Sequence, residues 1–129
     1  MKQLFFALCA FFAIVCLQGC NKDTIRYGKE WELTELKGEQ LPAGVRIMVV
    51  FDEANKRYGG TASCNNYTGT FKLDGSTLKL SNPGVTKKTC PDMSWEMKYL
   101  PVLTKIDTWS VIDGKLKLSS EGNVVAVYK

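Results

Sequence analysis

The residues best suited to chemistry are cysteines, because the chain contains five of them and no histidine. Cys9 and Cys16 lie in an apolar run near the N-terminus, Cys20 follows that run, and Cys64 and Cys90 stand alone in the remaining chain. The absence of histidine excludes imidazole acid–base catalysis, histidine-activated nucleophiles and histidine metal ligands. We therefore expect no enzyme activity, no metal site and no cofactor.

Cys64 and Cys90 are expected to form a structural disulfide if the protein is exported, because oxidising compartments favour the pairing of thiols. Closing such a loop stabilises a fold by about 3.5 kcal/mol on the chain-entropy estimate. Two buried free thiols and a reactive redox pair are the alternatives. The redox alternative lacks a Cys-x-x-Cys spacing that would lower the pKa of either thiol.

Several polar residues could bind a ligand or could simply shape the backbone. Asn65 and Asn66 fit a turn, since asparagine tolerates left-handed backbone, although their amides could also bind a partner. Glu96 could be a functional carboxylate or a first-turn residue that opposes the helix dipole. Asp52 and Glu53 are expected to be loop residues, and they have too few neighbouring ligands for a calcium site.

The N-terminus has the pattern of an export signal. Met1-Lys2-Gln3 precedes fourteen apolar residues from position 4 to 17, which is the length of a signal-peptide core and shorter than the roughly 20 residues of a membrane span. Leu17-Gln18-Gly19-Cys20 then resembles the lipobox of bacterial lipoproteins, although Gln18 replaces the usual small residue. An ordinary signal peptide with a chance cysteine is the alternative.

This pattern predicts a signal peptide over residues 1–19 and lipid attachment at Cys20. Acyl chains are sufficient as an anchor, because each buried methylene contributes about 0.8 kcal/mol. Residues 20–28 are expected to be a lipidated tether and residues 29–129 the single domain. We expect a monomer held to the outer membrane of the cell envelope, on its periplasmic or its surface face, with the lipid contacting the membrane and an envelope protein as a possible partner.

The charge distribution gives no sign of nucleic-acid binding. The chain has 17 basic and 13 acidic residues, a formal charge of +4, and Lys87-Lys88 is one of only two adjacent basic pairs after the signal, with Lys56-Arg57. Nucleic-acid binding calls for a dense basic face. A solvated loop or strand face is the simpler interpretation of Lys87-Lys88.

From Trp31 onward, short apolar stretches separated by turn residues predict an antiparallel β domain. The apolar run 47–51 predicts a central strand covered on both faces, and alternation over 67–73 predicts a strand with one buried face. Similar hairpins are expected at the Asp-Gly turns of positions 74–75 and 113–114, through internal duplication or convergence. The final apolar run, 124–128, should be the last core strand.

One helix is predicted between the two hairpins, because apolar residues recur there at three- and four-residue spacing. The stripe includes Trp95 and Tyr99, and Asp92 or Ser94 could cap it. Pro101 should bend or break the helix near Leu100. Trp31, Trp95 and Trp109 are expected to pack in the core.

Four features in order resemble one known family. They are Trp31-x-Leu33, the segment Cys64-Asn65-Asn66-Tyr67-x-Gly69, the segment from Thr86 to Cys90, and Glu96 ahead of a helix. This series resembles the META-domain family, also described as heat-shock-protein HslJ-like, over roughly residues 29–129. Ser63 departs from the family's usual glycine, and Lys88 departs from its usual methionine.

The resemblance implies an α+β fold that is predominantly antiparallel β, with about eight short strands and one helix packed on them. It also implies an envelope protein linked to stress or antibiotic tolerance, with Asn65, Asn66, Tyr67, Gly69 and Glu96 as family-motif residues that could bind a partner. We expect a non-catalytic structural or binding module. The alternative is an inhibitor of an envelope-attacking enzyme, resembling lysozyme-inhibitor lipoproteins, that would present an exposed loop around residues 82–88.

Overall fold

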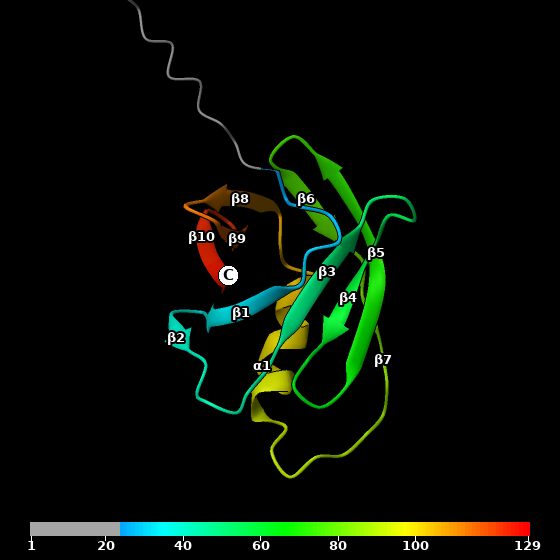
Figure 1. Ribbon diagram of the computed structural model, residues 1–129, viewed down its shortest axis with the longest axis vertical. Helices are drawn as coiled ribbons and strands as arrows, with labels where there is room; N and C mark the ends of the chain where they lie inside the picture. Colours follow the sequence, from blue (N-terminus) through cyan, green and yellow to red (C-terminus); the bar gives the residue numbers. More distant parts are fainter. Residues whose placement is uncertain (1–23) are drawn as a thin grey trace, which may run out of the picture.

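The computed structural model describes residues 24–129, so the predicted signal peptide and the lipid site at Cys20 lie outside the described part. Within residues 24–129, ten strands and one helix follow one another (Figure 1). Eight strands have four or more residues, as the prediction of about eight short strands implies, and β2 and β7 have only two each. In chain order the elements are β1 (Trp31–Leu36), β2 (Glu39–Gln40), β3 (Met48–Asp52), β4 (Arg57–Thr61), β5 (Asn66–Asp74), β6 (Thr77–Leu80), β7 (Gly84–Val85), α1 (Ser94–Leu103), β8 (Thr108–Ile112), β9 (Lys115–Ser120) and β10 (Asn123–Tyr128).

The longer strands form a closed circuit of antiparallel pairings. The order is β10-β9-β8-β6-β5-β4-β3-β1, and β1 also pairs with β10. The circuit closes through the register of Leu33 with Tyr128 and of Leu36 with Ala126. Closure leaves few unpaired edges, which protects a β protein against edge-to-edge association.

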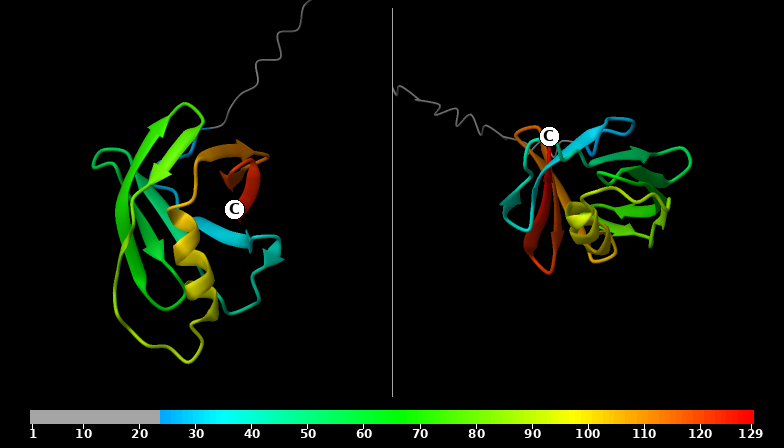
Figure 2. Two further views of the ribbon diagram at one scale, coloured as in Figure 1. Left: turned by 180° about the vertical axis from the view of Figure 1, so that it is seen from behind. Right: turned by 90° about the horizontal axis from the view of Figure 1, so that it is seen from below.

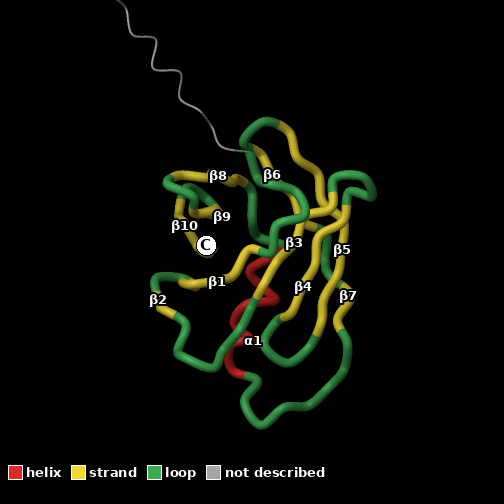
Figure 3. Tube along the Cα trace, in the orientation of Figure 1, coloured by secondary structure: helices red, strands yellow, loops and turns green. Residues whose placement is uncertain are grey.

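α1 lies between the two halves of the strand circuit (Figures 1 and 2). One half contains β3, β4 and β5, and the other contains β8, β9 and β10. A long segment runs from β7 around the lower end of the molecule to the start of α1 (Figure 3). The helix therefore joins two sheets through its buried side chains, which are Glu96, Tyr99, Val102 and Leu103.

The two predicted Asp-Gly hairpins are present as β5–β6 and β8–β9. Gly75 has φ +57°, and Asp113 and Gly114 have φ +53° and +74°. These left-handed conformations match the twist of the strands, which is why such turns favour Asp and Gly. The strand predicted at 47–51 is observed as β3, but only its Val49 and Phe51 face is fully buried.

Three sequence expectations need correction. α1 continues through Pro101 and does not break near Leu100; the proline removes the one backbone hydrogen bond that residue 101 would have donated to the Met97 carbonyl. Trp31 is fully buried, whereas Trp95 and Trp109 pack only against the edge of the core. The last strand begins at the surface, since Val124 is 47% exposed.

The predicted tether also ends earlier than residue 28. Ile25 is buried, and its carbonyl accepts a hydrogen bond from the Trp31 indole at 2.8 Å. The Gly28 amide donates to the Phe51 carbonyl at 2.9 Å. A single apolar residue in a polar stretch gives no periodicity, so this contact with the domain was not visible in the sequence.

Candidate functional site

Asn65 occupies the turn between β4 and β5 and is only 3% exposed. Its side-chain oxygen accepts hydrogen bonds from the Lys88 amide at 2.6 Å and the Thr86 hydroxyl at 2.9 Å. Its side-chain nitrogen donates to the Lys88 carbonyl at 3.1 Å. The Asn65 amide therefore pairs with the Lys88 backbone as a neighbouring strand would, and it holds the segment that leads into Cys90.

Glu96 lies in the first turn of α1 with its carboxylate directed at the same turn, and it is 4% exposed. The carboxylate accepts hydrogen bonds from the Asn65 backbone amide at 2.6 Å, the Asn65 side-chain nitrogen at 2.7 Å and the Cys64 amide at 3.3 Å. No cation pairs with it among the described residues. Charge-assisted hydrogen bonds from N–H groups therefore hold this buried carboxylate.

This arrangement agrees with the first-turn interpretation of Glu96 and adds contacts that neither sequence interpretation included. Its position in the first turn suits the helix dipole, but its oxygens bond to the preceding turn rather than facing solvent or a cleft. Asp92, not the N-cap residue Met93, accepts from the Ser94 amide at 2.9 Å. The Ser94 hydroxyl and amide lower the pKa of Asp92.

The predicted disulfide is confirmed. Cys64 and Cys90 are bonded, with an S–S distance of 2.09 Å and Cα atoms 6.0 Å apart. The bond joins the two segments that Asn65 also connects. We call Cys64, Asn65, Thr86, Lys88, Cys90 and Glu96 the motif network.

Tyr67 belongs to a second buried network, which sequence reasoning did not detect. Its hydroxyl donates to the Met48 carbonyl at 2.7 Å and lies 2.7 Å from the Tyr99 hydroxyl. The Tyr99 hydroxyl lies 2.9 Å from that of Tyr128. Because a carbonyl only accepts, the donors must run from Tyr128 to Tyr99, from Tyr99 to Tyr67, and from Tyr67 to Met48. We call Tyr67, Tyr99 and Tyr128 the tyrosine chain.

The tyrosine chain links β3, β5, α1 and β10 at the centre of the molecule. Burial raises the pKa of Tyr67 and Tyr99 well above the ordinary value, and burial also raises that of Tyr128. Tyr58 is separate, because its hydroxyl donates to the Ser81 carbonyl at 2.6 Å. Burial raises the pKa of Tyr58 to about 12. All four phenols are therefore neutral hydrogen-bonding groups at physiological pH.

Asn66 and Gly69 have different roles from Asn65. The Asn66 side chain is exposed, while its backbone exchanges hydrogen bonds with Thr86. Gly69 is buried opposite Tyr58, and a Cβ added there would lie 2.6 Å from the Tyr58 ring and 2.7 Å from the Ser81 hydroxyl. Gly69 is thus required by the close approach of the Tyr58 ring.

The structure shows the setting of both departures from the family pattern. Ser63 has φ +82°, a conformation that glycine adopts more easily than any other residue. The Lys88 side chain is exposed, and the motif network uses only its backbone amide and carbonyl. The second departure therefore leaves the contacts of the motif intact.

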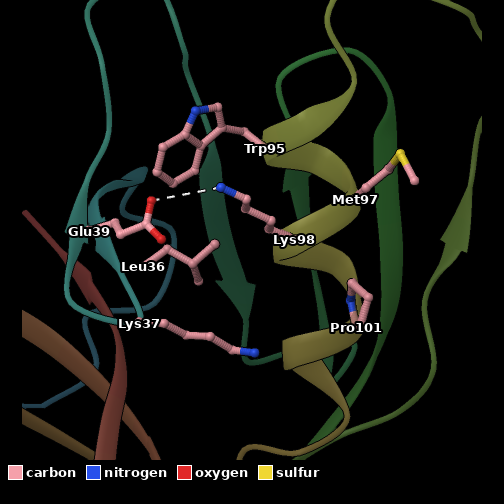
Figure 4. A pocket seen from close by; sticks show the side chains of 7 residues that line it. All are labelled: Leu36, Lys37, Glu39, Trp95, Met97, Lys98 and Pro101. Atoms are coloured by element: carbon pink, nitrogen blue, oxygen red, sulfur yellow. Dashed lines mark ion pairs between the residues drawn. The ribbon is translucent and has the colours of Figure 1, made fainter.

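The buried side chains of the motif network, Asn65 and Glu96, bond within the network rather than to an open site. The helix that the network holds, however, lines a pocket on its other side. The pocket has a volume of about 190 Å³. In Figure 4, Trp95 and Lys98 extend from α1 toward the β1–β2 hairpin, and Lys37 extends toward the helix. We call this the helix–hairpin pocket; its lining residues are Leu36, Lys37, Glu39, Trp95, Met97, Lys98 and Pro101.

The pocket combines apolar surface with an excess of positive charge. The Lys98 ammonium lies 3.7 Å from Glu39 and 4.9 Å from the centre of the Trp95 ring. Lys37 has no ion-pair partner in residues 24–129. Met97, at the pocket rim, is 71% exposed. None of these five residues was a predicted site residue, because only the fold brings β1–β2 beside α1.

Within residues 24–129, no group of three or more Cys, Asp or Glu side chains could hold a metal ion. The Asp52 carboxylate instead accepts hydrogen bonds from the backbone amide of Ala54 and the side-chain nitrogen of Asn55 in its own turn. Those bonds, the Asn55 side chain first, lower the pKa of Asp52. The described part of the chain also contains no helix with the length and hydropathy of a membrane span.

Comparisons with known proteins agree on the fold. The NMR structure of a protein from Burkholderia xenovorans superposes with a TM-score of 0.65 at 20% identity, over 80% of this chain and 81% of that one. A second NMR structure gives a TM-score of 0.60 at 16% identity, over 77% and 86%. A search of the curated proteins finds no match. The family model described as META domain matches residues 23–129.

Proposed function

The chain belongs to the META-domain family, and on that premise we propose that it is a lipid-anchored, non-catalytic binding module of the outer membrane that supports tolerance of envelope or antibiotic stress. The lipobox-like Leu17-Gln18-Gly19-Cys20 supports the anchor. The lack of histidine in the whole sequence supports a role without catalysis.

The observation that carries the binding role is the helix–hairpin pocket. Trp95 and Met97 offer apolar contact area, and aromatic and methionine side chains are enriched at the centres of protein interfaces. Lys37 extends toward α1 on the side from which Trp95 projects and supplies a positive charge with no ion-pair partner among the described residues, while Met97 is directed away from the hairpin (Figure 4). The partner should therefore be an envelope-protein segment that presents an apolar side chain next to an acidic one.

The motif network gives this pocket its rigidity. Glu96 lies between Trp95 and Met97 in the sequence, and its carboxylate is bonded to the Asn65 turn. A fixed helix start means that little side-chain and backbone freedom is lost on binding. In this proposal the family motif acts indirectly, by positioning the side chains that contact the partner.

Site-specific photocrosslinking in cells tests the proposal. A photoreactive residue at Met97 should give a discrete protein adduct, and the same residue at Ile112, a matched exposed apolar position (53% exposed) outside the pocket, should not. Lys37→Glu should abolish the Met97 adduct by reversing the unpaired charge. Met97→Asp should lower survival of envelope stress, whereas Ile112→Asp should not. Equal adducts at both positions, or full survival with Met97→Asp, would refute the proposal.

The second candidate is an inhibitor of an envelope-attacking enzyme. It is favoured by the loop before Cys90, where Lys87 and Lys88 are exposed while the backbone is held by Asn65 and the disulfide. A rigid exposed loop binds with little loss of conformational freedom. Titration of lysozyme with the purified mature protein should then show stoichiometric inhibition that Lys87→Glu with Lys88→Glu abolishes.

A further inference from the structure

A second pocket lies at the opposite end of the molecule from the start of α1. Its volume is about 280 Å³, and its lining is mainly apolar. We call it the N-terminal surface; its residues are Thr24, Ile25, Tyr27, Leu73, Gly75 and Trp109. It lies where the described chain begins, beside the β5–β6 turn and the start of β8, whereas α1 begins at the lower end (Figure 1).

Both aromatic side chains of this surface are held in place by contacts within the protein. The Trp109 indole donates to the Gly75 carbonyl at 2.9 Å. Tyr27 stacks on Phe71 with ring centroids 6.3 Å apart. An indole whose N–H is already bonded can lie against apolar material without leaving a polar group unsatisfied.

Covalent geometry limits how far this surface can lie from the lipid. Four residue steps separate Cys20 from Thr24, and each step spans at most about 3.6 Å, so the two Cα atoms are within about 14 Å of each other. The headgroup region of one leaflet is itself roughly 5 to 8 Å thick. A lipid on Cys20 would therefore hold the N-terminal surface next to the bilayer.

We propose that the N-terminal surface rests on the lipid headgroups of the bilayer that holds the Cys20 lipid, with Tyr27 and Trp109 at the interface. Tyrosine and tryptophan prefer this region because each combines an apolar ring with a polar group. The contact turns the start of α1 and the helix–hairpin pocket away from the membrane and toward other envelope proteins. This inference rests on the proposed lipid anchor.

Tryptophan quenching in vesicles tests the orientation. The lipidated mature protein is reconstituted into phosphatidylethanolamine–phosphatidylglycerol vesicles, with or without brominated acyl chains. Trp95→Phe leaves Trp109 as the surface reporter, and Trp109→Phe leaves Trp95; fully buried Trp31 is common to both. Bromine should quench the Trp95→Phe variant at least about twofold more than the Trp109→Phe variant, because only Trp109 would lie at the interface.

A second measurement uses the unsubstituted protein, in case either variant folds poorly. Hydrogen exchange at residues 24–28 and 73–77 should slow on vesicles relative to the unlipidated Cys20→Ser protein, while exchange at residues 94–98 stays the same. If the protein floats with vesicles but both measurements show no difference between the ends, the orientation is wrong and the anchor stands. If the wild-type protein carries no lipid and does not float, the anchor itself is wrong and the orientation fails with it.

Discussion

The motif network and the tyrosine chain are both buried and polar, yet they are built from different chemistry. The motif network contains a carboxylate, Glu96, that is held by N–H donors of a turn. The tyrosine chain contains only neutral hydroxyls, each of which donates a hydrogen bond to the next, in one direction from Tyr128 to the Met48 carbonyl. The first joins loops to a helix, and the second joins strands and a helix within the core.

The difference shows how each network should fail. A buried charge depends on every donor around it, so a change of a single atom is costly. A chain of neutral hydroxyls tolerates the loss of its first member but not the ionisation of its members. The following predictions test this contrast, from the largest expected effect to the smallest.

Alkaline pH should unfold the domain through the tyrosine chain. Burial raises the pKa of Tyr67, Tyr99 and Tyr128 above the ordinary value of 10.0. Below about pH 10 both states keep these phenols protonated, so their contribution to stability is fully present. Above that pH the unfolded chain ionises first, and stability falls by about 1.4 kcal/mol per pH unit for each tyrosine.

Circular dichroism and phenolate absorbance, followed together from about pH 9 to 12, measure this effect. The buried phenols should ionise in the same cooperative step in which the sheet signal is lost. Gradual ionisation of more phenols than the half-buried Tyr27 at about pH 10, with an intact sheet signal, would show that the tyrosine chain is open to solvent.

Asn65→Asp should be the most destabilising single substitution in the motif network. It places a second carboxylate at the position now 2.7 Å from a Glu96 oxygen and removes the donor to the Lys88 carbonyl. We expect the free energy of unfolding to fall by about 4 kcal/mol. Asn66→Asp is the control, because its exposed side chain should cost under about 1 kcal/mol; equal losses would contradict the network.

Removal of the disulfide by Cys64→Ser with Cys90→Ser should lower the free energy of unfolding by about 3.5 kcal/mol. The pair closes a loop with a sequence separation of 26. Urea unfolding of the double variant and of the reduced wild type should give similar midpoints. A reduced protein as stable as the oxidised one would mean that Asn65 and Glu96 alone hold the two segments.

Phenylalanine substitutions at the three positions of the tyrosine chain should lower the free energy of unfolding by different amounts. Tyr67→Phe should cost about 2 kcal/mol, because it leaves the Tyr99 hydroxyl without an acceptor and removes a donor to Met48. Tyr99→Phe should lower the free energy of unfolding by about 1.5 kcal/mol, since it leaves the Tyr128 hydroxyl without an acceptor. Tyr128→Phe should lower the free energy of unfolding by under about 1 kcal/mol, because it leaves no other hydroxyl without an acceptor. The reverse order in thermal unfolding would show that the Tyr67 hydroxyl does not donate to the Met48 carbonyl.

Ser63→Gly should stabilise the protein by about 1 kcal/mol, the approximate cost of a left-handed conformation for a residue with a Cβ. Ser63 has φ +82° in the turn that carries Cys64 and Asn65. The comparison variant is Ser81→Gly, a residue outside the positive-φ set, which should not stabilise. A lower melting temperature for Ser63→Gly would mean that the hydroxyl has a role of its own.

Much of the fold could be predicted because its signals are local. The Asp74-Gly75 and Asp113-Gly114 turns and the alternation along β5 all depend on neighbours in the sequence. The disulfide was also predictable, as the cysteines of the domain are only two. Trp95 was misplaced because helical periodicity shows which residues share a stripe, but not how far the core extends beneath them.

The sequence by itself determined the family, the β-rich class, the helix between the two hairpins and the cysteine pair. Turn residues and periodicity act over short distances in the chain, and the cysteine pair follows from counting. Only the tertiary structure decided that Asn65 meets Glu96, that three tyrosine hydroxyls align, and that Lys37 faces Trp95 across a pocket. The physical reason is that hydrogen bonds and pockets depend on directions and distances of a few ångströms between segments far apart in the chain. Those quantities are defined only once the strand circuit closes around α1.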